Sequence, residues 1–114
     1  MLPTSNYREL LLWLFRLRQR FSVTGNSMFP ILEAGEEVLV DTNAYHRFLP
    51  EIGDLIVAWH PQQPNLRIIK RVVKVDDNGN CFLMGENSLE SDDSRSFGLV
   101  SLQGIIGKVT SKFL

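Results

Sequence analysis

One of the four lysines has neighbours that would suit general-base chemistry. Segment 67–75 alternates as a strand does, which places Lys70 on one face between Ile68 and Val72. If that apolar face is buried, loss of hydration lowers the pKa of the lysine and makes a neutral amine available near neutral pH. The alternative interpretation is an edge-strand lysine that projects into water.

Ser27 is the candidate nucleophile. It lies in Gly25-Asn26-Ser27-Met28-Phe29-Pro30, between a glycine and an apolar segment that ends in proline. Gly25 permits backbone conformations closed to other residues, so another chain could approach closely there or meet an exposed N–H. A plain turn is the competing interpretation of this segment.

Segment 85–98 is bounded by glycines and rich in polar side chains that hydrogen-bond to the backbone in turns. This composition predicts an ordered loop rather than a strand. Asp93 and Arg95 are placed to form an ion pair that holds the loop in shape. A solvated loop without a catalytic task is the alternative.

A helix over residues 4–21 is predicted ahead of these segments. Leu10, Leu14, Leu17 and Phe21 fall on one face, with arginines on the opposite side. The helix could dock this apolar stripe on the domain, lie on an anionic membrane surface, or contact a partner protein. Residues 4–21 are therefore the expected site of any peripheral membrane contact.

Beyond residue 23 the helical period gives way to short apolar runs separated by turn signals. The Asn78-Gly79 pair is the strongest hairpin signal. We predict a mainly β fold, a small antiparallel or mixed domain with coiled sheets, that follows an N-terminal basic amphipathic helix in residues 1–22 and occupies residues 23–114. The predicted strands are 38–40, 55–59, 67–75, 81–84 and 99–109.

Composition narrows the function classes. The 114 residues allow one compact domain, and the net charge of −1 argues against binding nucleic acid by general electrostatics. The first 22 residues carry four arginines and one glutamate, a balance of +3, which leaves −4 for the rest. No apolar run is long enough to span a bilayer. A single cysteine, Cys81, excludes an internal disulfide and fits a reducing, cytoplasmic compartment.

Four segments together resemble the conserved boxes of type I signal peptidases. They are GNSMFP at 25–30, GDLIV at 53–57, RIIKRV at 67–72 and GENSLESDDSRSFG at 85–98. Their order and spacing match over residues 23–109. The resemblance implies a domain of the signal peptidase and LexA-like type and a serine endopeptidase with a Ser/Lys dyad.

The resemblance also implies a role for each matched position. Ser27 would be the nucleophile, Lys70 the general base, and Ser91 the side chain that orients the lysine amine, while Asp93 and Arg95 would form the structural ion pair. Many members have a serine where this chain has Gly25. The oxyanion hole would then rest on the backbone at Gly25, Ser27 and Met28, mainly on the Ser27 N–H. The last box usually begins Gly-Asp-Asn, whereas this one begins with Gly85-Glu86-Asn87.

Within this class the chain is most similar to the nickel-type superoxide dismutase maturation proteases. Such a protease removes a short leader from a precursor protein, which it would bind as an extended strand. The alternatives are a signal peptidase for secreted precursors, a LexA-like self-cleaving protease and a non-catalytic peptide-binding module. No cofactor, metal or nucleic acid is expected, because His46 and His60 lie in loop-like segments without ligand spacing and Cys81 is expected to pack on a strand.

Overall fold

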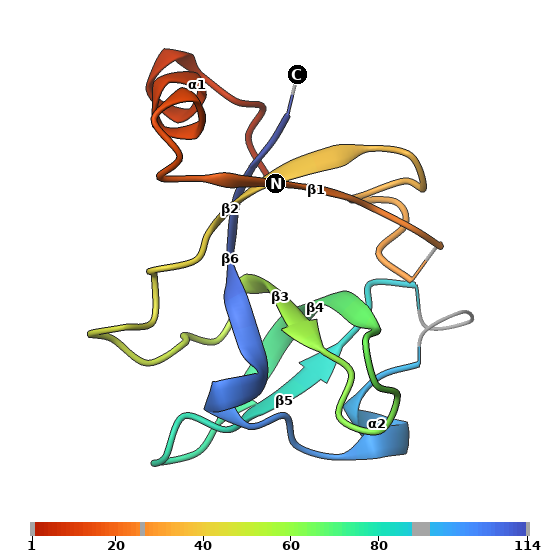
Figure 1. Ribbon diagram of the computed structural model, residues 1–114. Coiled ribbons are helices and arrows are strands. Elements are labelled where there is room, and N and C mark those ends of the chain that lie inside the picture. The colour runs from red at the N-terminus through yellow and green to blue at the C-terminus, as the bar shows by residue number, and fades with distance from the viewer. Residues whose placement is uncertain (1, 26, 88–91, 114) are drawn as a thin grey trace.

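The computed structural model describes residues 2–25, 27–87 and 92–113. Six strands form one sheet in the order β1-β2-β6-β3-β4-β5, and all neighbouring strands are antiparallel (Figure 1). The predicted mainly β fold with a short N-terminal helix is confirmed. The elements are α1 (Tyr7–Leu14), β1 (Gln19–Ser22), β2 (Glu37–Asp41), β3 (Leu55–Trp59), β4 (Arg67–Val75), β5 (Cys81–Met84), α2 (Ser94–Phe97), a 3₁₀ helix (Leu102–Gly104) and β6 (Ile105–Lys112).

The strands at the centre of the chain agree with the sequence pattern. β3, β4 and β5 have the predicted bounds, and β2 extends the predicted 38–40 by one residue at each end. The hairpin between β4 and β5 is also confirmed. In its turn, the Asp76 carboxylate accepts the amide N–H of Asn78 and of Asn80, each at 2.9 Å, and Gly79 has a φ of 84°. This turn needs both an acceptor at its start and a residue that tolerates positive φ.

The predicted helix over 4–21 is wrong in its second half. The helix ends at Leu14, Arg16 adopts a left-handed φ of 64°, and residues 19–22 form β1. Phe21 pairs with Val38 and is only 8% exposed. Pairing with β2 satisfies the backbone hydrogen bonds of this segment and buries Phe21. The free energy gained from these contacts outweighs the local preference for a helix.

The helix also docks through a different face from the one predicted. It has no buried residue, and Leu14 and Leu17 of the expected stripe are largely exposed. Instead, Glu9 accepts a hydrogen bond from the Thr110 hydroxyl and pairs with Arg18 at 3.2 Å, while the Trp13 ring packs edge-on against Phe113. Within the described part of the chain, no helix combines the length and apolar character needed to cross a bilayer.

The predicted strand over 99–109 begins too early and ends too soon. Leu102–Gly104 forms a 3₁₀ helix, and β6 runs from Ile105 to Lys112. Ser101 caps the 3₁₀ helix by accepting the amide N–H of Gln103, a local hydrogen bond that competes with strand pairing. Val100 still makes an isolated bridge with Cys81.

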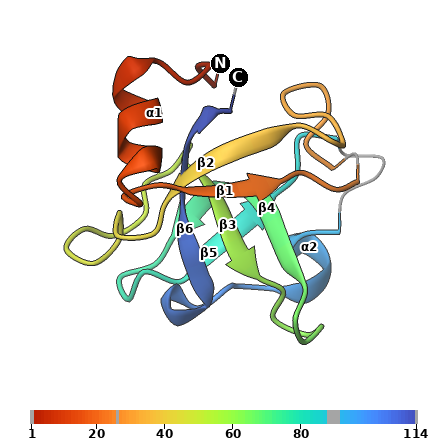
Figure 2. The ribbon, with the colours of Figure 1, turned by 45° about the horizontal axis from the view of Figure 1, so that its top comes forward.

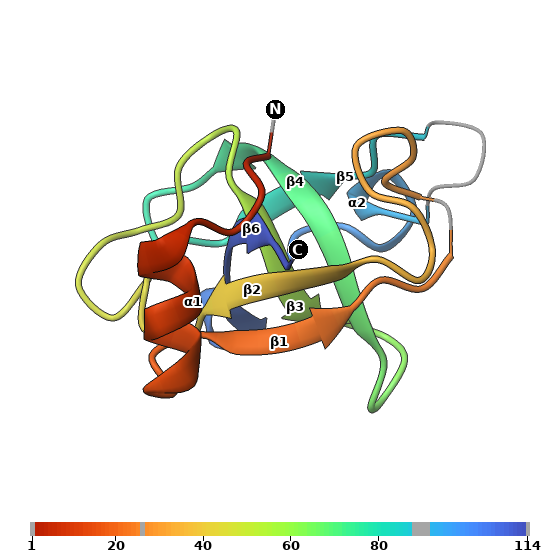
Figure 3. The same ribbon diagram turned by 90° about the horizontal axis from the view of Figure 1, so that it is seen from above.

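The sheet coils strongly, which brings β1 across β4 (Figures 2 and 3). Register shifts lie at Leu39/Val40 in β2 and at Val57/Ala58 in β3, and such bulges increase local twist. The coil encloses one core cluster, while a second lies beneath β5 and α2. The enclosed cluster consists of Phe21, Val23, Met28, Leu32, Val38, Val40, Leu55, Val57 and Val109.

Candidate active site

Lys70 lies in the middle of β4, opposite Ile56 of β3, and is only 4% exposed. Val72 on the same face is fully buried and Ile68 is partly buried, so the alternative of a lysine that projects into water is wrong. Burial lowers the pKa of the Lys70 amine. The carboxylates of Asp93 and Asp92 act in the opposite direction, but burial is the larger effect. The neutral amine is thus favoured more than in an ordinary lysine.

Ser27 lies in the chain after β1. Its position is fixed by a hydrogen bond of its own carbonyl and by the packing of the next residue. Next to it, Met28 is 2% exposed in the enclosed core, and its carbonyl accepts the Leu32 amide N–H at 2.9 Å. The Ser27 carbonyl accepts the amide N–H of Asn87 at 2.7 Å, which ties the serine to the last motif. Gly25 has a φ of 73°, a backbone conformation that other residues adopt only with strain.

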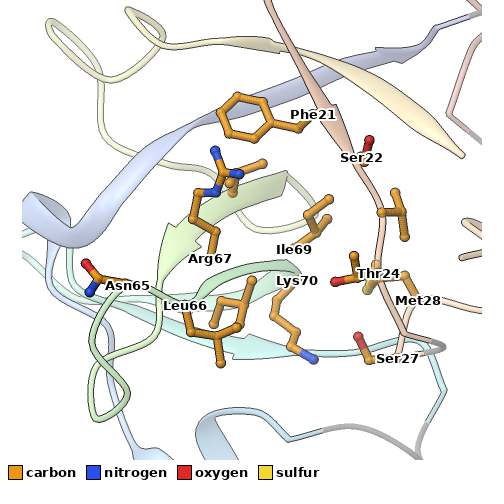
Figure 4. A pocket seen from close by; sticks show the side chains of 13 residues that line it. Phe21, Ser22, Thr24, Ser27, Met28, Asn65, Leu66, Arg67, Ile69 and Lys70 are labelled. Carbon is orange, nitrogen blue, oxygen red and sulfur yellow. The ribbon is translucent and has the colours of Figure 1, made fainter. Parts of the chain in front are cut away.

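The two candidate catalytic side chains line the same cavity, which has a volume of about 380 Å³. Figure 4 shows the amine end of Lys70 pointing toward the Ser27 hydroxyl. Residues 21–24, 27 and 28 line one wall of this cavity, and residues 65–70 line the other. A hydroxyl facing a desolvated amine is the arrangement of a nucleophile with its general base.

The predicted ion pair of the last motif is present in the structure, within its described residues 92–98. Arg95 and Asp93 lie 2.9 Å apart, and Asp93 also caps α2 by accepting the Arg95 amide N–H. Ser94 is buried, and its hydroxyl accepts the amide N–H of Leu83, which joins α2 to β5. Ser91, predicted to orient the lysine, lies outside the described residues.

His60 is part of this region, although the sequence placed it in an ordinary loop. Its Nε2 lies 3.1 Å from a carboxylate oxygen of Asp92, and its ring packs against Phe97. Nδ1 accepts the amide N–H groups of Gln62 and Gln63, which leaves Nε2 as the ring nitrogen that donates a hydrogen bond to Asp92. The sequence carries no signal for this pair, because its members are far apart in the chain.

Arg71 links three of the four motifs, a role that the sequence pattern did not reveal. Its guanidinium pairs with Glu86 and donates a hydrogen bond to the Gly53 carbonyl at 2.6 Å. Glu86 is one of the positions at which this chain departs from the usual motif. The unusual glutamate was the feature of the sequence that could have indicated this contact, because its longer carboxylate side chain pairs with Arg71.

Two other kinds of site, a catalytic thiol and a metal site, have less support among the described residues. Cys81 is fully buried on β5, and burial raises the pKa of its thiol to about 11, as expected of a packing residue. Across residues 2–25, 27–87 and 92–113, no three His, Cys, Asp or Glu side chains gather where they could hold a metal ion.

Comparisons with known proteins identify the family to which this chain is similar. The signal peptidase model of peptidase family S26 matches residues 8–77 and 75–114. The mitochondrial inner membrane protease subunit 1 of Xenopus tropicalis is 30% identical over 105 residues, which cover 75% of this chain and 63% of the relative. The probable signal peptidase I-1 of Synechocystis sp. is 28% identical over an alignment that is 148 residues long. This alignment covers 91% of this chain and 74% of the relative.

The chain therefore spans less than two thirds of the Xenopus relative's length. The family model covers almost all of the chain, and the matched residues include every described part of the cavity. This chain belongs to the S26 family of signal peptidases.

Proposed function

We propose that this chain is a serine endopeptidase that removes an N-terminal leader from a precursor protein, with Ser27 as nucleophile and Lys70 as general base. The observation that carries the proposal is the buried amine that points toward a serine hydroxyl across one cavity. Membership of the S26 family supports the same reaction class.

In the proposed reaction, Ser27 Oγ attacks the scissile carbonyl carbon while the neutral Lys70 amine accepts the hydroxyl proton. The backbone N–H of Ser27, with the flanking backbone at Gly25 and Met28, stabilises the oxyanion. The C–N bond then breaks, and the Lys70 ammonium donates its proton to the leaving amine. The Lys70 amine next takes a proton from a water molecule that attacks the ester carbonyl, and the Lys70 ammonium returns this proton to Ser27 Oγ as the C–O bond breaks. Ser91 is proposed to orient the amine throughout.

The specific substrate that we propose is a nickel superoxide dismutase precursor. The resemblance of the chain to the nickel-type superoxide dismutase maturation proteases supports this choice. A second substrate class, precursors processed at a membrane, is favoured by two relatives that are named as a mitochondrial inner membrane protease subunit and a probable signal peptidase.

Co-expression with each precursor class tests the proposal, with the product identified by intact mass. The wild type should remove the leader, and Ser27→Ala and Lys70→Met should each lower the rate by about 10⁴-fold or more. Lys74→Met is the matched control, because Lys74 is an exposed lysine on the same strand. If only the precursor that is processed at a membrane is cleaved, that class replaces the nickel superoxide dismutase precursor as the substrate. Processing of neither precursor, or full activity of Ser27→Ala, would contradict the endopeptidase proposal.

We further propose that processing takes place in the cytoplasm, at a membrane surface contacted through residues 4–21. Exposed Leu11, Leu14, Phe15 and Leu17 support such a contact, because large apolar side chains that face solvent favour an interface. Cosedimentation with anionic vesicles should be lost in Leu14→Glu, and cell fractionation would reveal the compartment.

A further inference from the structure

The cavity continues well beyond the two candidate catalytic residues. Figure 4 shows Ser27 and the amine of Lys70 at one end, and Phe21 with the guanidinium of Arg67 toward the other. A substrate chain that lies along this cavity with its scissile bond at Ser27 would also pass this second end. The side chains there are placed to read residues at some distance from the scissile bond.

Both walls of the cavity offer strand edges to an extended peptide. Residues 67–70 of β4 pair with β3 on one side, but pairing of β4 with β5 starts only at Arg71. On the opposite wall, β1 pairs with β2, and no other described strand pairs with it. A peptide added along such an edge advances about 3.3 Å per residue, like the strand beside it.

Arg67 is the distinctive side chain of this second end. Its guanidinium stacks over the Phe21 ring, with Cζ 4.8 Å from the ring centroid. Stacking on a buried ring restricts the side chain, so less conformational entropy is lost when it binds a ligand. By contrast, the neighbouring arginine on the same face, Arg71, is already paired with Glu86.

The charges around Arg67 favour an acidic ligand. Among the described residues that line the cavity none is acidic, and no described carboxylate lies within ion-pair distance of Arg67. The cationic side chains of the cavity are Arg67 and Lys70, and the pKa of Lys70 is lowered by burial. Arg67 thus supplies a positive charge at this end of the cavity, and a guanidinium can bind a carboxylate through two parallel hydrogen bonds.

We propose that Arg67 is a specificity-determining residue that selects substrates with an aspartate or glutamate about three residues from the scissile bond. The position follows from the rise of an extended chain, because Arg67 precedes Lys70 by three residues on β4 and a peptide beside β4 advances by nearly the same distance per residue. This inference rests on the proposed endopeptidase function, since it concerns the substrate of the same cavity.

The test uses leader peptides that are identical except at one position and carry alanine immediately before the scissile bond. Glu, Gln or Lys is placed in turn at each position from about two to five residues from that bond, on both sides. The wild type should show a kcat/KM about tenfold higher for Glu than for Lys at one position. Arg67→Gln should remove this preference, and Arg67→Glu should reverse it.

Arg47→Glu is the matched control, because it makes the same charge change at an exposed residue outside the cavity and should leave the preference intact. Equal cleavage of Glu and Lys peptides by the wild type at every position would overturn the proposal. An unchanged preference in Arg67→Glu would overturn it as well.

A binding measurement separates this proposal from the proposed function. The Ser27→Ala variant should bind the Glu peptide more tightly than the Lys peptide by the same ratio, and Arg67→Glu added to it should reverse the order. If the wild type cleaves no peptide but this binding order holds, the endopeptidase function fails and the acidic preference stands. If neither cleavage nor a binding difference is found, both proposals fail.

Discussion

Arg95 binds Asp93 through both carboxylate oxygens, with Nε 3.0 Å from Oδ1 and Nη2 2.9 Å from Oδ2. Asp93 is fully buried, and the same carboxylate accepts the amide N–H of Gly85 at 3.2 Å. This side chain therefore connects the beginning and the end of the last motif. Its charge also acts on Lys70, and it raises the pKa of the amine against the effect of burial.

Removing either partner of this ion pair should shift the pH dependence of cleavage, and the two shifts should have opposite signs. Burial is the main cause that lowers the pKa of Lys70, the Asp93 charge raises it, and the Arg95 charge lowers it further. We expect the pH at which kcat/KM rises to be lower in Asp93→Asn than in the wild type, and higher in Arg95→Gln. The measurement is the pH profile of each variant beside the wild type. Shifts in the same direction would contradict this electrostatic account.

Lys70 should lower the stability of the protein at neutral pH. Because its pKa is lower in the folded state than the ordinary value of 10.5, the unfolded state binds more protons between these two values. The free energy of unfolding of the wild type, relative to Lys70→Met, should rise across that window by up to about 1.4 kcal/mol per pH unit. Below the lowered pKa the full cost of the buried ammonium applies.

Urea denaturation of both proteins over a pH series measures this difference directly. Lys74→Met controls for the loss of a lysine from the same strand, since Lys74 is exposed. A difference between wild type and Lys70→Met that does not change with pH would show that Lys70 titrates like an ordinary lysine.

His60 should stabilise the protein through its hydrogen bonds rather than through its shape. His60→Phe keeps an aromatic ring against Phe97 but removes the donor to Asp92 and the acceptor for two backbone amides. We expect the free energy of unfolding to fall by about 1–2 kcal/mol. His46→Phe, at an exposed position, should change it by less than about 0.5 kcal/mol. If chemical denaturation shows that His60→Phe and His46→Phe lower the free energy of unfolding equally, this role of His60 is contradicted.

Gly107 should be essential for the coil of the sheet. A Cβ at this position would lie 2.6 Å from the backbone oxygen of Asp41, so β2 and β6 would have to separate. Gly107→Ala should lower the free energy of unfolding by about 2 kcal/mol or more. Gly104→Ala is the control, because its Cβ would meet ordinary van der Waals contact at 3.6 Å. Similar melting temperatures for the two variants would show that β6 accommodates the methyl group.

Much of the candidate site could be predicted because its signals are local. Strand alternation was enough to place Lys70 on one face with Ile68 and Val72, and the Asn78-Gly79 pair was enough to define the hairpin. Asp93 and Arg95 are two residues apart, so their ion pair needed only a turn. In each case the residues that decide the structure lie within a few positions of one another.

The wrong predictions lie where contacts between distant segments determine the local structure. Local pattern predicted a helix through Phe21, but pairing with β2 makes residues 19–22 a strand, since a sheet edge satisfies that backbone and buries the ring. The exposed Leu14 has the same cause, because the helix docks through Glu9 and Trp13 on partners near the C-terminus. A single helical pattern cannot show which face its distant partners will contact.

The sequence by itself determined the candidate chemistry of this protein: which serine, which lysine and which surrounding motifs. Only the tertiary structure decided what surrounds that chemistry. The coil of the sheet brings Arg67 over Phe21, His60 to Asp92 and Arg71 to Glu86, contacts between residues that are far apart in the chain. Such contacts depend on register, bulges and the close approach at Gly107, which exist only once the sheet has closed around its core.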